Sequence, residues 1–429
     1  MTAIEKIRER VSELYRFRDE YFTTHSSDEA TNKTKEVQEE INKTLKMIDS
    51  LKDQVSAENK GELFFLRGKA LNATQEYSPE AEEELGRATR FNLSDAWNEL
   101  GECQFKKGDL AGAHTCFEKA LKLAQNKVYY RNMSMLMRSL PWKTGTEREN
   151  NVEKGLDYAR KAINLDMNDG HSWLVLGNAY LASFFTIDSK LESLKNCKAA
   201  YTKASSDPVA ATLPELHFSK FHVQWYEEDY AGALLSLRKA SELEPSWVEC
   251  KAKFNECHKF LSKLTLMVKS KGQLNQRRIN SLVADIHPSQ LGPYEKGGTN
   301  LTAGKKPDLV PLSLLGEGNN QDKIVLGKVV CTVIPESGIP FSMCVIDKEG
   351  DCMAITVYNW ASGCGVKIGD SVAVVAPVLK SHSIEVSKDE NLEFRAIRVA
   401  LPLMLVVNKR AVGVSQVATS QIVSQQKPE

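Results

Sequence analysis

The chain has 429 residues, of which 42% are hydrophobic and 26% charged, and its 56 Lys and Arg residues balance 56 Asp and Glu residues. These values are typical of an ordinary globular protein with two or three domains. A formal net charge of zero excludes a global field that attracts nucleic acid or an anionic membrane. No apolar run approaches the roughly 20 residues of a membrane-spanning helix, and residues 1–6 do not resemble a signal peptide. We therefore expect no membrane partner.

The nine cysteines are scattered along the chain and include no C-x2-C pair. Several of them, such as Cys103, Cys116, Cys331 and Cys344, fall at apolar positions of predicted helices or strands. Buried free thiols in a reducing compartment are the simplest interpretation of this pattern. We therefore expect a cytoplasmic and nuclear protein.

The first predicted elements are two long amphipathic helices over residues 3–24 and 28–55. Apolar residues recur with helical spacing in both, and Ser26, Ser27 and Asp28 supply turn and capping residues between them. Neither helix carries the repeat signature described next. Because terminal repeats are often atypical, we expect residues 1–56 to form an N-terminal cap.

A repeat of about 34 residues organises the following part of the chain. Residues 97–101 (WNELG) with 113–120 (AHTCFEKA), and residues 173–180 (WLVLGNAY), match the tetratricopeptide pattern W-x2-L-G-x2-Y followed by A-x3-F. A glycine or alanine opposite a large side chain lets two short antiparallel helices approach closely, and stacked pairs bury apolar faces that one pair leaves exposed. The alignment predicts tetratricopeptide repeats over residues 57–269, with starts near residues 61, 94, 127, 170, 214 and 248.

Two of the intervals between these starts are about ten residues longer than the others. They predict insertions at Pro141–Glu149 and Phe184–Leu191, which we expect to be surface loops. The last start opens a helix from Trp247 to about Lys269 that would cover the exposed end of the stack.

In tetratricopeptide superhelices the leading helix of each pair lines a concave groove, and the predicted register selects the side chains that face it. The selected set is mixed in charge. Arg138 could hold a ligand carboxylate as a bidentate fork, and Glu215 and Glu249 could receive an arginine or a free amino terminus. The alternative is that these charges form a solvated face or pair with one another. The predicted peptide-binding residues are Arg131, Arg138, His171, Asn178, Glu215, His222 and Glu249, with Asp95, Asn98 and Glu102 from the preceding repeat.

The composition changes after Val268 and predicts a basic linker over residues 270–306, with a short helix near Gln276 to Ile286. A compact group of cations without acidic neighbours could contact phosphate. The alternative is a solvated linker. The group consists of Lys269, Lys271, Arg277 and Arg278.

From Leu309 the periodicity becomes that of strands. Residues 366–372 (VKIGDSV) resemble the turn into the fourth strand of an oligonucleotide/oligosaccharide-binding (OB) barrel, which we expect over residues 307–411. The tail, 412–429, is expected to be disordered. The predicted fold is thus mainly α with a C-terminal all-β domain. The predicted strands are Ile324–Val333, Phe341–Ile346, Cys352–Trp360, Ser371–Val378 and Phe394–Val407.

The barrel invites a nucleic-acid function, because many OB folds stack bases on aromatic residues. Phe341, Tyr358 and Trp360 could do so, but aromatic residues at strand positions more often belong to the core. Residues 307–410 also hold ten basic and twelve acidic residues, a poor composition for binding a single strand. We therefore favour a docking role for the barrel.

No constellation typical of catalysis is present: the sequence has no nucleophile elbow, phosphate-cradling glycine loop or metal-spaced His/Cys set. We expect a non-enzymatic protein without catalytic residues, cofactor or metal.

Repeats followed by a single OB-like barrel are an unusual combination. The chain resembles the tetratricopeptide repeat protein 5 family over nearly its whole length, excepting loops and tail. The stretches that carry this resemblance are Leu14–Asp19, Lys107–Phe117, Ile324–Val330 and Gly365–Val372.

The resemblance implies two functions. One is recognition of the Met-Arg-Glu N-terminus of nascent tubulin at the ribosome, followed by recruitment of an mRNA-decay factor and decay of the tubulin mRNA. The other is a nuclear scaffold that assembles transcriptional coactivator proteins around an acetyltransferase in the stress response. Arg138, Glu215 and Glu249 match the family's peptide-contacting positions. The family's ribosome-facing basic segment corresponds to residues 269–278, although Gln273, Asn275 and Gln276 dilute the charge here.

We therefore predict a peptide-capturing adaptor. Two alternatives from other classes remain. One is a nucleic-acid-binding transcription cofactor that uses the barrel, which the charge of residues 307–410 disfavours. The other is a carboxylate-clamp chaperone adaptor, which the acidic residues Glu215 and Glu249 disfavour.

Overall fold

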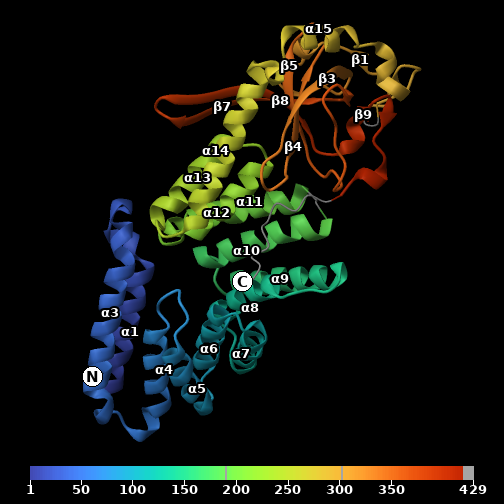
Figure 1. Cartoon of the computed structure of the whole chain (residues 1–429). Coiled ribbons are helices and arrows are strands. Elements are labelled where there is room, and N and C mark those ends of the chain that lie inside the picture. The colour runs from blue at the N-terminus through green and yellow to red at the C-terminus, as the bar shows by residue number, and fades with distance from the viewer. Residues whose placement is uncertain (189–190, 301–302, 419–429) are drawn as a thin grey trace. The chain divides into compact units, whose positions relative to one another are not determined.

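The computed structural model describes residues 1–188, 191–300 and 303–418. Its residues divide into two compact units, which we describe separately: the first holds residues 1–223 and 238–248, and the second holds residues 224–237 and 249–418. Helices fill the N-terminal part of the chain and strands appear only beyond residue 307 (Figure 1). The predicted fold class, mainly α with a C-terminal all-β domain, is confirmed.

The N-terminal segment forms α1 (Ala3–Asp19), α2 (Tyr21–Thr24) and α3 (Ala30–Leu51). The first predicted helix is interrupted at Glu20, and Thr2 caps α1 through a reciprocal pair of hydrogen bonds with Glu5. The apolar faces of α1 and α3 bury Ile7, Leu14 and Ile41 against the first repeat helix. The two long helices therefore pack onto the repeats, as a cap does.

The leading helices of the repeats begin at or within one residue of the predicted starts. Gly101 and Gly177 face Phe117 and Tyr201, and a Cβ atom on either glycine would lie within 2.5 Å of the facing ring. These glycines therefore allow the close helix approach that the pattern predicts. The helices are α4 (Lys60–Leu71), α5 (Pro79–Ala88), α6 (Ser94–Lys107), α7 (Leu110–Leu123), α8 (Lys127–Ser139), α9 (Gly145–Leu165), α10 (Gly170–Ser183), α11 (Leu191–Ser205), α12 (Pro214–Tyr226), α13 (Tyr230–Leu243) and α14 (Val248–Lys269).

The two predicted insertions differ in structure. Residues 141–147 are exposed, and α9 begins within the segment at Gly145, after the capping residue Thr144. The second insertion is not a surface loop: Phe184–Asp188 forms a π-helical turn, η5, in which Phe184 and Phe185 are only 1% and 3% exposed. Two adjacent apolar rings gain more from burial than a loop gains from hydration. Residues 189–190 lie outside the described residues.

The C-terminal strands form a barrel, and its pairing order is β10-β9-β6-β3-β4-β5-β8-β7-β2, with β1 beside β3. Strands β5 and β8 are parallel, whereas the other pairs along this path are antiparallel. The strands are β1 (Asp308–Leu309), β2 (Gly318–Asn319), β3 (Lys323–Val333), β4 (Phe341–Ile346), β5 (Cys352–Val357), β6 (Ser371–Val375), β7 (Val378–Ser387), β8 (Glu390–Val399), β9 (Leu405–Val407) and β10 (Arg410–Ala411).

One bent strand closes this barrel. β6 pairs with β3, whereas β7 pairs with β8 at the other end of the series β3-β4-β5-β8. Only Ala376 and Pro377 separate β6 from β7 in the chain. Ala376 has a φ of 49°, which turns the strand between its two partners. As predicted from residues 366–372, a turn with Gly369 at a φ of 96° leads into β6. The interior is filled by the inward side chains of the strands, among them Val329, Val345, Ile355, Val372 and Ile397.

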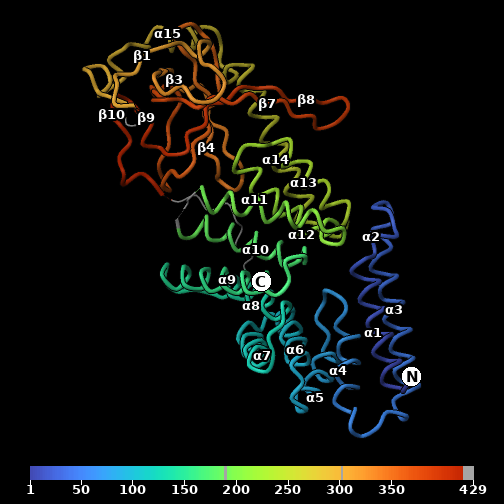
Figure 2. Tube along the Cα trace, turned by 180° about the vertical axis from the view of Figure 1, so that it is seen from behind, coloured from blue at the N-terminus to red at the C-terminus, as the bar shows by residue number. Residues whose placement is uncertain are grey.

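The β7–β8 hairpin was not predicted as a unit, since the sequence indicated one strand ending at Val378 and another beginning at Phe394. It extends well beyond the other strands (Figures 1 and 2). Along Ser381–Ser387 of β7 the residues alternate between exposed and buried, with His382, Ile384 and Val386 inside and polar residues outside. The strand was not predicted because serines on its outer face lower the apolar content of the segment.

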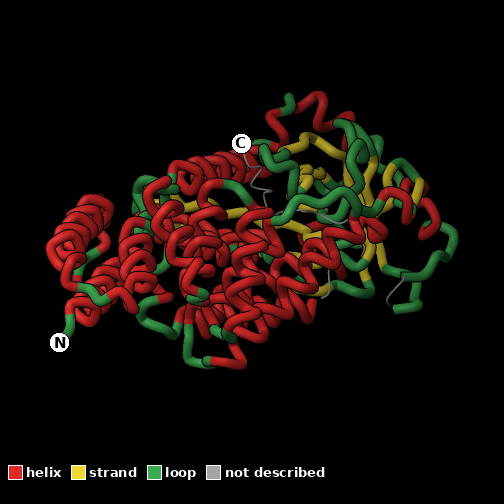
Figure 3. Tube along the Cα trace, turned by 90° about the horizontal axis from the view of Figure 1, so that it is seen from below, coloured by secondary structure: helices red, strands yellow, loops and turns green. Residues whose placement is uncertain are grey.

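The predicted linker is folded. It holds η7 (Lys271–Gln273), α15 (Gln276–Ala284) and η8 (Pro288–Tyr294), and Ile286, Leu291 and Tyr294 join an apolar cluster with β3, β6 and β9. The beginning of the predicted disordered tail is also packed: Val412 is buried and Val417 forms a β-bridge with Trp360. Residues 419–429 lie outside the described residues. Figure 3 shows the helices, strands and loops of the described residues in separate colours.

Candidate functional site

Arg138 lies in the last turn of α8, where the repeat register places it on the groove side. Its Nη1 atom donates a 2.8 Å hydrogen bond to Ser134 Oγ and a long one, 3.5 Å, to the carbonyl oxygen of Val175 on α10. Within the described residues no carboxylate forms an ion pair with it. Desolvation lowers the pKa of Arg138 to about 10, and the phenol of Tyr201 opposes this shift only weakly. Arg138 is therefore a half-buried cation without a counter-ion.

Tyr201 interacts with both Arg138 and Asn178. The Tyr201 hydroxyl donates a 2.7 Å hydrogen bond to Asn178 Oδ1. Tyr201 was not among the predicted site residues, and its packing against Gly177 does not reveal this polar role. The structure thus brings together two predicted residues, Arg138 and Asn178, with a phenol that positions the amide.

Glu215 lies in the first turn of α12 and is exposed to solvent. Desolvation by the surrounding chain nevertheless raises the pKa of its carboxyl, while Lys33 of α3 acts in the opposite direction. Lys33 in turn has its pKa lowered by desolvation, against the attraction of Glu244 and Glu215. Lys33 belongs to the predicted cap, and nothing in the sequence marked it as part of the site.

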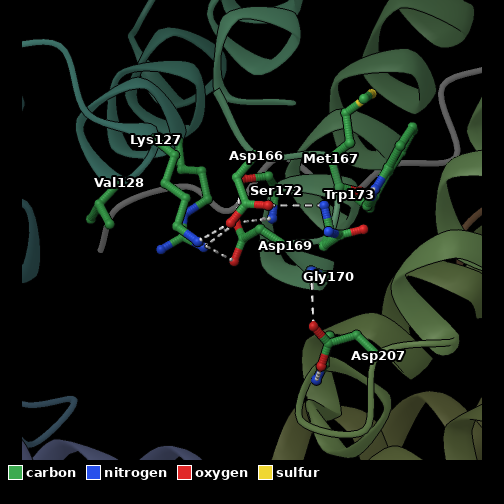
Figure 4. Close-up of polar contacts among 12 residues, drawn as sticks. Lys127, Val128, Asp166, Met167, Asp169, Gly170, Ser172, Trp173 and Asp207 are labelled. Atoms are coloured by element: carbon green, nitrogen blue, oxygen red, sulfur yellow. Dashed lines mark hydrogen bonds and ion pairs between the residues drawn. The ribbon is translucent and has the colours of Figure 1, made fainter. Parts of the chain in front are cut away.

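Arg131 is neutralised within the repeats. Its Nη1 atom lies 2.8 Å from Asp169 Oδ2, and Lys127 approaches the same carboxylate at 3.3 Å and Asp166 at 2.7 Å. Asp169 also caps α10 by accepting from the backbone N–H of Ser172 at 3.0 Å. Figure 4 shows this cluster around the start of α10. Arg131 therefore links α8 to the start of α10. For this residue the structure favours the alternative in which the charges pair with one another.

The start of α10 has a second acidic partner. Asp207 accepts a 3.0 Å hydrogen bond from the backbone N–H of Gly170, and a Cβ atom on that glycine would lie 2.4 Å from the Asp207 Cβ (Figure 4). His171 follows on α10 and is partly exposed. Desolvation and the charge of Arg131 lower its pKa, against Asp169 and Asp19. His171 is thus a neutral imidazole between charges at neutral pH.

His222 is only 7% exposed, and its ring packs against the rings of Phe218 and Phe221 at centroid distances of 5.0 Å. Its aromatic neighbours on α12 place it in the core, so it does not offer a surface to a ligand. Glu249 lies exposed in the first turn of α14, within the second unit.

The predicted polar residues of the second repeat bond to one another. Asn132 Nδ2 donates to Glu102 Oε1 at 2.6 Å and to Asn98 Oδ1 at 3.0 Å, and Asn98 Nδ2 donates to Glu102 at 3.0 Å. Asp95 accepts a hydrogen bond from the Tyr129 hydroxyl. These polar side chains therefore have hydrogen-bond partners within the repeats, whereas Arg138 has no carboxylate partner among the described residues.

The basic group at the end of α14 is accessible. Lys269, Arg277 and Arg278 are exposed and Lys271 is partly exposed. In the described part of the second unit none of the four forms an ion pair. The turn η7 that carries Lys271 packs on β3, because a Cβ atom on Gly272 would lie 2.7 Å from the carbonyl oxygen of Val330.

Within the second unit, a turn between α12 and α13 covers the outer face of β5 and β8. Thr356 Oγ1 donates a 2.6 Å hydrogen bond to Glu228 Oε1, and Arg398 Nη1 lies 3.3 Å from the same oxygen. Arg398 also donates to the Tyr226 carbonyl oxygen at 2.7 Å. The Glu228 side chain is fully buried.

Aromatic rings complete this contact. The Arg398 guanidinium lies 4.1 Å from the centroid of the Tyr358 ring, and Tyr226 packs edge-on to Tyr358 at 5.2 Å. Tyr358, one of the three aromatic residues that could have stacked a base, is thus buried under the chain's own turn. Phe341 and Trp360 pack on the barrel core.

No three His, Cys, Asp or Glu side chains of the described residues are grouped so that they could hold a metal ion. No described helix is both long and apolar enough to span a bilayer.

Comparisons with known proteins agree with this architecture. Residues 306–421 match the family model "Tetratricopeptide repeat protein 5 OB fold domain", and residues 94–127 match the tetratricopeptide repeat model. Neither model describes a catalytic domain. Proteins called tetratricopeptide repeat protein 5 from Homo sapiens, Bos taurus and Mus musculus are each 38% identical over 431 residues, covering 99% of this chain and 97% of the relative. The chain therefore belongs to the tetratricopeptide repeat protein 5 family.

Proposed function

We propose that this protein is a non-enzymatic adaptor whose repeats capture a short peptide that carries both a basic and an acidic group. The proposed ligand is the Met-Arg-Glu N-terminus of nascent tubulin, which the repeats recognise as tubulin leaves the ribosome. Recruitment of an mRNA-decay factor then lowers tubulin synthesis.

The observation that carries this proposal is that Arg138 is desolvated and forms no ion pair with a described carboxylate. A desolvated guanidinium without a carboxylate is unfavourable in the unliganded protein, and a ligand carboxylate relieves that cost. The planar fork suits bidentate binding of a glutamate side chain. Asn178 accepts a hydrogen bond from Tyr201 through its Oδ1 atom, and we assign its amide N–H groups to the ligand backbone.

Glu215 supplies the opposite charge. Desolvation raises the pKa of its carboxyl, so a ligand arginine or amino terminus stabilises its ionised form. Glu249 matches a peptide-contacting position of the family and is exposed. A peptide with an arginine next to a glutamate complements the opposite charges of Glu215 and Arg138.

The exposed cations Lys269, Lys271, Arg277 and Arg278 are the proposed contact with ribosomal RNA, whose phosphates bind such groups without sequence preference. A cytoplasmic location follows from this function. The nuclear coactivator scaffold is the function that remains if the tubulin peptide does not bind.

The test is binding of a labelled Met-Arg-Glu-Ile peptide to the full-length protein and to Arg138→Ala, with circular dichroism to verify folding. Losing a charge-assisted contact costs about 1.5–3 kcal/mol, so affinity should fall roughly tenfold or more. Equal affinity for a peptide whose glutamate is replaced by lysine would contradict the assignment, and no binding by the wild type would exclude this ligand.

A further inference from the structure

Three cysteines lie on adjacent strands of the barrel. Cys331 on β3 is directly opposite Cys344 on β4, and Cys352 on β5 is opposite Ile346, two residues from Cys344. Because side chains alternate along a strand, Cys344 and Ile346 point to the same face, and Cys352 is a diagonal neighbour of Cys344. The three thiols therefore lie on one face of three neighbouring strands.

A β-bulge produces this arrangement. The register of β3 and β4 shifts between Val329 and Cys331. Val329 points into the barrel core, and without the bulge the alternation of side chains would place Cys331 on the same side. The extra residue instead turns Cys331 to the outer face, opposite Cys344.

The Cys331–Cys344 pair meets the geometric requirement of a disulfide. Directly opposed residues of an antiparallel pair have Cα atoms about 4.5–5.5 Å apart, within the range of about 4.4–6.8 Å that disulfides span. The Cα atoms of the diagonal pair Cys344 and Cys352 are about 7–8 Å apart by the same geometry, outside that range, although their thiols also interact. Cys331 is 8% exposed and Cys344 is fully buried.

We propose that Cys331 and Cys344 are a reversible oxidation site, in which a small hydroperoxide converts the two thiols into a cross-strand disulfide. Cys331 is the thiol that the oxidant reaches, and Cys344 is the resolving thiol.

The chemistry balances with hydrogen peroxide as the oxidant. The Cys331 thiolate attacks one peroxide oxygen, the O–O bond breaks, and a sulfenic acid and hydroxide form, the hydroxide taking up the proton that the thiol released. The Cys344 sulfur then attacks the sulfenic sulfur, an S–S bond forms, and water leaves with the Cys344 proton. Two thiols and one peroxide thus give one disulfide and two waters.

The surroundings support Cys331 as the attacking group. Interaction with Cys344 lowers the pKa of the Cys331 thiol, and the ammonium of Lys263 on α14 adds to this against the effect of burial. Since the thiolate is the reactive form, a lower pKa raises its fraction at neutral pH. Cys116 and Cys257 are the contrast, because desolvation raises the pKa of both thiols.

The test treats the full-length protein with hydrogen peroxide, blocks remaining thiols with N-ethylmaleimide and maps the peptides by mass spectrometry. The expected product is a Cys331–Cys344 cross-linked peptide that dithiothreitol removes. In Cys344→Ser the sulfenic acid at Cys331 should persist and be trapped by dimedone, whereas the control Cys116→Ser should behave as the wild type.

Two results would overturn the proposal. One is that Cys331 and Cys344 remain reduced while the partly exposed Cys352 and Cys364 are oxidised. The other is a Cys344–Cys352 cross-link, which would assign the chemistry to a different pair. Because the wild-type map decides both cases, the outcome does not depend on whether the variants fold.

Discussion

Two charged residues of the repeats, Arg138 and Glu215, form no ion pair with any described side chain. Arg138 has its pKa lowered and Glu215 has its pKa raised, and desolvation is the main cause of both shifts. Each shift favours the neutral form, so each charge is held at a cost to the unliganded fold. We interpret this cost as preparation for a ligand.

Replacing Arg138 by methionine should therefore separate stability from binding. Methionine keeps much of the packing volume and removes the uncompensated charge, so the free energy of unfolding in urea should stay the same or rise. Affinity for Met-Arg-Glu-Ile should fall at least about tenfold. Arg90→Met, at an exposed arginine between α5 and α6, is the control and should change neither quantity. A large loss of stability in Arg138→Met would instead make this arginine a structural residue.

Affinity should also depend on pH through Glu215. Its folded-state pKa lies above the ordinary value of 4.5, so on acidification it takes up a proton earlier than an ordinary glutamate. The carboxylate binds a cation only when ionised, so affinity for the peptide should fall as the pH drops through the raised pKa. Isothermal titration at pH 7.5 and 5.5 measures this. Glu215→Gln should bind more weakly at pH 7.5 and lose most of the change with pH; an unchanged pH profile would assign the effect to other groups, such as His171.

Sequence reasoning identified Arg138 and Glu215 because the repeat register alone decides which face a helical residue occupies. It could not separate them from Arg131 or His222. The pairing of Arg131 with Asp169 depends on the distance between α8 and the start of α10, and the burial of His222 depends on how Phe218 and Phe221 pack around it. Neither fact follows from periodicity.

At the scale of elements, the turn between α12 and α13 fixes helices to the barrel within the second unit. Glu228 adopts a φ of 61°, a left-handed conformation that costs a non-glycine residue about 1–2 kcal/mol. The conformation places its carboxylate between Thr356 and Arg398. The contacts of the buried side chain account for the tolerated backbone strain.

Removing this carboxylate should destabilise the second unit strongly. Glu228→Ala leaves the buried Arg398 guanidinium uncompensated, and breaking such a pair costs about 3–5 kcal/mol in urea unfolding. Glu385→Ala, at an exposed glutamate on the outer face of β7, is the matched control and should change stability by less than about 0.5 kcal/mol. Equal stability of the two variants would show that the buried contact does not fix the turn to the barrel.

The elements themselves were predictable to different degrees. The repeat helices begin where glycine and aromatic positions indicated, since each pair must meet the same packing condition. The β7–β8 hairpin was missed because one of its faces is polar, and the segment 270–306 was taken as a linker because its charges and glycines masked the apolar residues Ile286, Leu291 and Tyr294. Burial of these residues depends on barrel strands far along the chain.

At the scale of the whole molecule, the proposed adaptor uses two separate surfaces, one for the peptide and one for the ribosome. Reversing the charge of Arg277 and Arg278 together to glutamate should abolish salt-sensitive co-sedimentation with ribosomes, because both groups would repel phosphate. Peptide affinity should not change. Lys348→Glu combined with Lys388→Glu, at exposed lysines elsewhere in the second unit, is the charge-matched control. Retained co-sedimentation of the arginine variant would show that the ribosome is contacted elsewhere.

The most direct test of the central claim is a double-mutant cycle between Arg138 and the glutamate of the Met-Arg-Glu-Ile peptide. Affinities are measured for the wild type and Arg138→Ala, each with the native peptide and with a peptide carrying glutamine instead of glutamate. The proposal predicts that each change alone weakens binding and that the second adds little once the first is made, with a coupling of about 1.5–3 kcal/mol. Strictly additive effects would show that the two groups do not meet and would contradict capture of the peptide at Arg138.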